Sequence, residues 1–159
     1  SDLAIDFVRI DDRLVHGQVA TTWIKKYEIE QVIVINDLLA NDPVQKSVLE
    51  MTAPQGIRIL LFGVDKFTEV YKNNPIKRKT MLIYTNPEDV YRNLKAGVKI
   101  PYLNVGGMKH VLNKEKLTKA VAVDEKDKMD FKEIMNLGVN VEIQMIPADK
   151  VTNMKEFIK

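Results

Sequence analysis

The chain has 159 residues, a formal net charge of +2 and no cysteine. This length favours one domain over residues 1–159, which is large enough to fold without stabilising cross-links. The lack of cysteine excludes disulfides and thiolate metal sites. The apolar runs are too short to span a bilayer, and the small net charge gives no indication of nucleic-acid binding. We therefore expect a soluble, cytoplasmic protein that has no signal peptide.

The first polar segment of the chain joins a predicted strand to a predicted helix. Residues 5–10 are mostly apolar, whereas apolar residues recur at helical spacing over 18–27. Between them, RIDDRLVHGQ (residues 9–18) carries two arginines, two aspartates, a histidine and a glycine. In an open α/β sheet such a loop lies at the carboxyl ends of the strands, where ligands bind beside the N-terminus of the next helix.

These residue types favour phosphoryl chemistry on His16. Neutral imidazole, with an unperturbed pKa of about 6.5, is a nitrogen nucleophile, and a guanidinium group binds phosphate oxygens in a bidentate fork. Arg13 lies three residues before the histidine. We expect Asp12 or Asp11 to hold Arg13 or to accept the second imidazole N–H. We expect Gly17 to let the backbone approach the phosphate.

Other interpretations of this loop stay open on the residues alone. His16 can be a capping or salt-bridging residue, or the general base of a hydrolase. A flavodoxin-like binding domain can use Arg9, Arg13 and the helix N-terminus to hold a phosphorylated metabolite. A metal site at Asp11 and Asp12 is disfavoured, because no further group with ligand spacing completes it.

Predicted strands and helices alternate along the whole chain. The predicted strands cover residues 5–10, 32–35, 57–63, 80–84, 102–105, 118–123 and 140–146, the last at a sheet edge. The predicted helices cover residues 18–27, 42–54, 65–73, 86–97, 124–137 and 148–158. We expect Asp42, Asn86 and Asp124 to cap three of them, the first two directly before a proline. Seven strands and about six helices predict a three-layer α/β sandwich, with a mostly parallel sheet of about seven strands and helices on both faces.

Two further segments are predicted to lie beside the histidine loop. Asn36 and Asp37 follow the second strand, where they either contact the loop or the phosphoryl group or shape a turn. Gly106 and Gly107 form a glycine-bearing loop after the fifth strand, which either admits another group close to the backbone or shapes a turn. Glycine fingerprints of nucleotide folds are absent, so a donor other than bound ATP fits better and no cofactor is expected.

The run RIDDRLVHGQVATTW resembles the active-site signature of the IIB components of the mannose, fructose and sorbose family of the sugar phosphotransferase system (PTS). VIVINDLLANDPVQ, AGVKIPYLNVGGM and TKAVAVDEKD resemble later segments of that family in the same order, so the similarity covers nearly the whole chain from about Phe7. The resemblance implies that a IIA component phosphorylates His16, which passes the group to a sugar held by membrane IIC and IID components. It implies that Arg13 neutralises the phosphate and that Asp12 supports the loop.

The resemblance also implies an enzyme, a protein-Nπ-phosphohistidine–sugar phosphotransferase with a covalent phosphohistidine intermediate. Such a protein would lie at the inner face of the membrane through IIC and IID, and those membrane components would choose the sugar. A homodimer is compatible with Trp23 and Tyr27, which we expect in the core or at an interface. We expect phosphate binding or support of the loop from Arg9, Asp11, Leu14, Val15, Gly17, Gln18, Asn36, Asp37, Gly106 and Gly107.

Overall fold

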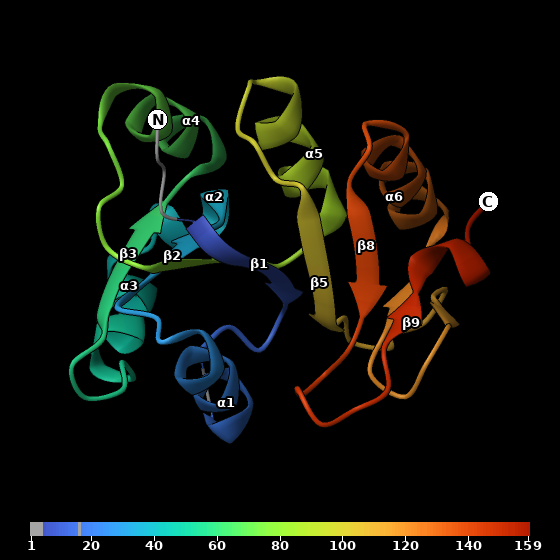
Figure 1. The fold of residues 1–159 in the computed structure, drawn as a ribbon, viewed down its shortest axis with the longest axis horizontal. Helices are drawn as coiled ribbons and strands as arrows, with labels where there is room; N and C mark the ends of the chain where they lie inside the picture. Colours follow the sequence, from blue (N-terminus) through green and yellow to red (C-terminus); the bar gives the residue numbers. More distant parts are fainter. Residues whose placement is uncertain (1–4, 16) are drawn as a thin grey trace.

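The computed structural model describes residues 5–15 and 17–159, and their main feature is a seven-stranded sheet (Figure 1). The strand order is β3-β2-β4-β1-β5-β8-β9, and all neighbours pair in parallel except β9, which runs antiparallel at one edge. The predicted α/β class and mostly parallel sheet are therefore confirmed. The strands are β1 (Ile5–Asp11), β2 (Gln31–Ile35), β3 (Arg58–Phe62), β4 (Thr80–Tyr84), β5 (Tyr102–Gly107), β8 (Asn140–Ile143) and β9 (Thr152–Asn153).

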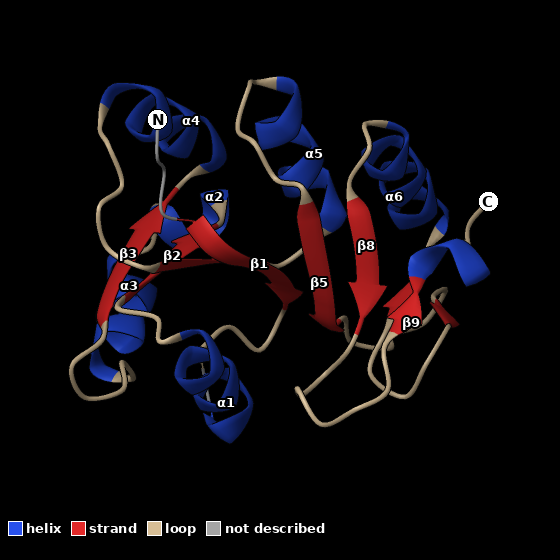
Figure 2. Cartoon of the chain, in the orientation of Figure 1, coloured by secondary structure: helices blue, strands red, loops and turns tan. Residues whose placement is uncertain are grey.

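Helices cover both faces of the sheet, as the alternation of strands and helices predicts (Figure 2). In this view α4, α5 and α6 lie above the sheet, and α1 and α3 lie below it. The helices are α1 (Gly17–Tyr27), α2 (Asp37–Ala40), α3 (Pro43–Met51), α4 (Val64–Asn73), α5 (Pro87–Lys95), α6 (Glu125–Asn136) and the 3-10 helix η1 (Met154–Glu156). The predicted caps are present: Asp42, Asn86 and Asp124 each accept backbone N–H groups at a helix start.

The core has two halves, one on each face of the sheet. Successive side chains of a strand point to opposite faces. Accordingly, Val32 and Val34 of β2 belong to the cluster that includes side chains of α1 and α3, whereas Ile33 and Ile35 belong to the cluster that includes side chains of α4, α5 and α6. All four side chains are buried, which explains why this strand is a continuous apolar run.

The prediction of a sheet strand over 118–123 is wrong. Only Ala122–Val123 form a strand, β7, which pairs antiparallel with β6 (Glu115–Lys116) in a separate two-stranded sheet. The backbone groups that a sheet strand would use are taken locally, because Leu117 N–H donates to the Val121 carbonyl. Residues 109–121, which we call the arm, therefore stand beside the end of β5.

The prediction of a helix over residues 148–158 is also wrong. Met154 and Ile158, four residues apart, are both buried, and this spacing resembles that of a helix. In the structure, residues 152–153 instead pair with the outer side of β8, and only a 3-10 turn follows. As a result β8 is not the edge strand predicted over 140–146.

Two smaller differences concern segments near the carboxyl ends of the strands. Gly106 and Gly107 belong to β5 and do not form a loop. Asn36 caps the short helix α2, which lies outside the helices predicted from the sequence. Within the described residues, no helix combines the length and the apolar character needed to cross a membrane.

Candidate functional site

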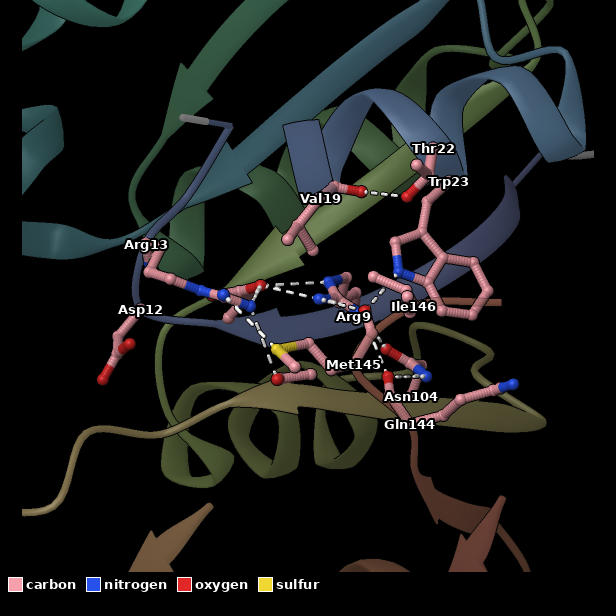
Figure 3. Close-up of polar contacts among 12 residues, drawn as sticks. Arg9, Asp12, Arg13, Val19, Thr22, Trp23, Asn104, Gln144, Met145 and Ile146 are labelled. Atoms are coloured by element: carbon pink, nitrogen blue, oxygen red, sulfur yellow. Dashed lines mark hydrogen bonds and ion pairs between the residues drawn. The ribbon is translucent and has the colours of Figure 1, made fainter. Parts of the chain in front are cut away.

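Charged side chains meet at the carboxyl end of β1, in the segment predicted to carry the chemistry (Figure 3). Arg9 and Asp11 are two residues apart and so share one face of the strand. The Asp11 carboxylate accepts hydrogen bonds from Nη2 of Arg9 and from Nη2 of Arg13, each at 2.7 Å. It also accepts from Nε of Arg13 at 2.9 Å, so one carboxylate joins two guanidinium groups.

Arg9 supports the site from inside the protein and does not present a surface for phosphate. Its side chain is 1% exposed, and all five N–H groups of the guanidinium have acceptors. The group also lies 5.3 Å from the centre of the Trp23 ring. The acceptors are the Asp11 carboxylate, Oδ1 of Asn104, and the carbonyl oxygens of Gln144 and Met145.

The electrostatics of this cluster keep Asp11 ionised. Burial acts to raise the pKa of Asp11, but the hydrogen bond from Arg13 and the charge of Arg9 outweigh it and hold the pKa below its ordinary value. The hydrogen bond with Asp11 raises the pKa of Arg13, and burial lowers the pKa of Arg9. The result is a fixed carboxylate between two cations.

Arg13 combines a fixed position with access to solvent. Asp11 holds Nε and Nη2, which form one edge of the guanidinium. Nη1 lies 3.7 Å from Sδ of Met145, and the side chain is 43% exposed. Nη2 also lies 3.5 Å from the Gly106 carbonyl oxygen. The edge formed by Nη1 and Nη2 can therefore exchange these two long contacts for an anion without disturbing the pair with Asp11.

Gly106 and Gly107 make room for these ionic groups. A Cβ atom on Gly106 would lie 2.0 Å from Cζ of Arg9, and one on Gly107 would lie 2.9 Å from Oδ1 of Asp11. The pairing of β1 with β5 shifts by one residue at this point, because Ile10 lies opposite Val105 but Asp11 lies opposite Gly107. The group that approaches this backbone is thus the protein's own arginine.

The loop after β1 is tied to neighbouring segments. The N–H of Asp12 donates to the Gly107 carbonyl at 3.1 Å, and Oδ2 of Asp12 accepts the N–H of Lys109 at 2.7 Å. Leu14 has a φ of +64°, which is unusual for a residue with a side chain, and its N–H donates to the Asp11 carbonyl. Val15 is buried against α1.

The predicted acceptor, His16, lies outside the described residues. After it, Gly17 begins α1 with a φ of +76°, and Gln18 is exposed in the first turn of that helix. The first backbone N–H groups of a helix have no partner within the helix and favour anions. The segment next to His16 in sequence therefore contains a helix N-terminus.

The structure does not bring Asn36 and Asp37 to the cluster. β2, which they follow, is separated from β1 by β4. Asn36 accepts the N–H of Leu39 and donates to Thr85. Asp37 accepts the N–H of Val64 and pairs with Arg92, whose hydrogen bond lowers the pKa of Asp37.

Sequence reasoning missed the groups that hold Arg9 from the far end of the chain. Two of them are the carbonyl oxygens of Gln144 and Met145, and any residue type supplies a carbonyl. Trp23 Nε1 donates to the same Met145 carbonyl at 2.8 Å. Asn104 did leave a signal in the sequence, because it is a polar residue inside an otherwise apolar strand. In the structure it is fully buried.

A surface hollow of about 410 Å³ opens beside Arg13. Met145 and Gly107 form part of its wall. Its charged lining residues are Asp12, Arg13, Lys109 and Lys119. Among the described residues, no group of three or more His, Asp or Glu side chains could hold a metal ion.

Comparison with known proteins places these features in one family. Residues 5–159 match the family described as "PTS system sorbose subfamily IIB component". The chain is 41% identical over 158 residues to the PTS system mannose-specific EIIAB component of Escherichia coli K12, covering 98% of this chain and 49% of that protein. It is 37% identical over 157 residues to the PTS system sorbose-specific EIIB component of Klebsiella pneumoniae, covering 98% and 96%.

Solved structures give the same result. The crystal structure of the IIBSor domain of the sorbose permease from Klebsiella pneumoniae superimposes with a TM-score of 0.90 at 35% identity, covering 97% of this chain and 95% of that one. The chain spans about half the length of the mannose-specific relatives it matches and nearly the full length of the sorbose-specific one.

Proposed function

We propose, because this chain belongs to the sorbose subfamily of PTS IIB components, that His16 accepts a phosphoryl group and passes it to a sugar. The donor is the phosphohistidine of a IIA component, and the acceptor is a hexose held by membrane IIC and IID components. The family match and the named relatives support a PTS IIB component that acts in sugar phosphotransfer.

The transfer has two steps, and the first moves the phosphoryl group from the donor histidine to His16. A ring nitrogen of His16 attacks the phosphorus with its lone pair, the P–N bond to the donor breaks, and its electron pair returns to the donor's nitrogen. In the second step a sugar hydroxyl attacks the same phosphorus, and its proton passes to the solvent. The electron pair of the breaking bond then returns to His16, so the protein ends as it began.

The observation that carries this proposal is the way Arg13 is presented. Asp11 fixes one edge of the Arg13 guanidinium, and the side chain is still 43% exposed. A phosphoryl group in transfer spreads its charge over three oxygens, and a prepositioned cation stabilises that charge without reorganising. Arg13 lies three residues before His16, and the N-terminus of α1 follows directly in sequence.

Intact mass spectrometry tests the proposal. The protein is incubated with phosphoenolpyruvate, the general phosphotransfer proteins and a IIA protein, and fragmentation then places any added phosphate. We expect a single acid-labile phosphate on His16. No labile adduct, with the donor proteins shown to be phosphorylated, would overturn the proposal. Turnover of a phosphate ester without partner proteins would support a hydrolase instead.

Replacing Arg13 with lysine is expected to slow transfer by roughly 100-fold, the usual cost of losing one prepositioned donor at a transition state. A lysine ammonium cannot pair with Asp11 along one edge and offer a second edge to phosphate. Rapid-quench measurement of His16 labelling gives the rate. The matched control is Arg78→Lys, because Arg78 is exposed and precedes β4 at the opposite end of the sheet. Equal rates for both variants would show that the guanidinium fork has no role.

A further inference from the structure

Two lysines of the arm lie together in the hollow beside Arg13. Lys109 and Lys119 are ten positions apart in sequence, but both line the hollow. The backbone fixes this approach, because Met108 N–H donates to the Ala120 carbonyl and Met108 forms a parallel bridge with Val121. Asp12 adds a third tie through the Lys109 N–H. The two lysine backbones are therefore held next to the Arg13 loop.

The hollow carries an excess of positive charge. Its lining contains Arg13, Lys109 and Lys119 against a single carboxylate, Asp12. Both lysines are exposed, and neither forms a salt bridge with another described residue. Lys114, also in the arm, differs in this respect, because its ammonium pairs with Asp127.

We infer that Lys109 and Lys119 attract the phosphorylated donor protein to the site, an inference that rests on the proposed function. A phosphoryl group on a donor histidine carries about two negative charges, whereas the sugar acceptor is neutral. Exposed charges act over about 10 Å at roughly 0.1 M ionic strength. These lysines therefore accelerate the encounter with the donor, and they distinguish it from the neutral acceptor.

The experiment measures the second-order rate constant for labelling of His16 by phosphorylated IIA protein. The test variant is the double substitution Lys109→Gln and Lys119→Gln. At an ionic strength of about 0.02 M we expect it to react about tenfold more slowly than wild type, the lower end of known steering effects. At about 0.5 M the two rate constants should converge, since salt screens the attraction. The charge-keeping variant Lys109→Arg with Lys119→Arg should retain the wild-type salt dependence.

The matched control carries Lys72→Gln and Lys77→Gln. Both of these lysines are exposed and lie near the amino ends of the strands, so the control has the same net charge with the hollow intact. A test variant that behaves like this control would overturn the inference and leave the proposed function standing. A slow rate that persists at high salt would also overturn it, because the effect would not be electrostatic. No labelling of wild type would instead refute the proposed function.

Discussion

Replacing His16 with alanine is expected to abolish phosphoryl acceptance. The intact mass of this variant should not change on incubation with phosphoenolpyruvate, the general proteins and IIA. The physical reason is that the acceptor must offer a nitrogen lone pair at neutral pH, and neither Arg13 nor the carboxylates of the loop can do so. We expect a loss of at least about a thousandfold in labelling rate, as for removal of other covalent nucleophiles.

The second histidine of the chain provides the control. His110 lies in the exposed arm, and His110→Ala removes an imidazole of the same kind. This variant should accept phosphate normally. Circular dichroism during heating shows whether either variant has lost its fold, so a missing nucleophile is distinguished from an unfolded protein. If His16→Ala still gained an acid-labile phosphate, the acceptor would be another group and the proposal would lose its centre.

Replacing Gly106 with alanine is expected to destabilise the protein by about 3 kcal/mol or more, the range found when a buried ion pair is broken. The added Cβ would lie 2.0 Å from Cζ of Arg9, which is 1% exposed and uses all five guanidinium N–H groups in hydrogen bonds, so it cannot move away without giving some of them up. Displacing Arg9 would also leave Asp11 with one cation in place of two. Thermal unfolding should show a midpoint lowered by about 10 °C.

The matched control for this substitution is Gly138→Ala. Gly138 has a φ of +92°, and a Cβ atom there would meet nothing within 4 Å. This change therefore adds the same methyl group at the cost of backbone strain alone, about 1–2 kcal/mol. Comparable losses for the two variants would contradict the assignment of Gly106 as the residue that admits Arg9. A labelling assay on folded Gly106→Ala protein would then report whether Arg13 is still positioned.

The sheet and its caps could be predicted because each depends on local residue pattern. Continuous apolar runs gave β2 and β4, and Asp42 or Asn86 before proline gave the starts of α3 and α5. The C-terminal segment could not be predicted in the same way. This segment consists of a two-residue strand followed by a 3-10 turn. Two buried residues at helical spacing, 154 and 158, do not determine a helix.

The candidate site was only partly predictable for a related reason. Residue types in the 9–18 segment pointed to an ionic cluster, and Asp11 with Arg13 forms one. The sequence could not show that Arg9 turns inward, since that depends on Gly106 leaving space and on carbonyl acceptors from residues 144 and 145. Asn36 and Asp37 were grouped with the loop because the carboxyl ends of parallel strands lie at the same edge of a sheet. The strand order, however, places β4 between β2, which they follow, and β1.

The wide sequence separation of the Arg9 contacts has a consequence for how the protein is made. The bond from Arg9 to the Met145 carbonyl joins residues 136 positions apart. Contacts of such long range form late in folding, because a large loop must close first. During synthesis, a chain that has not yet emerged as far as residue 145 leaves part of the Arg9 guanidinium unpaired and Trp23 Nε1 without its acceptor. Arg9, the second cation beside Asp11, is therefore fully held only after residue 145 has been made, whereas Arg13 pairs with Asp11 through contacts that are local in sequence.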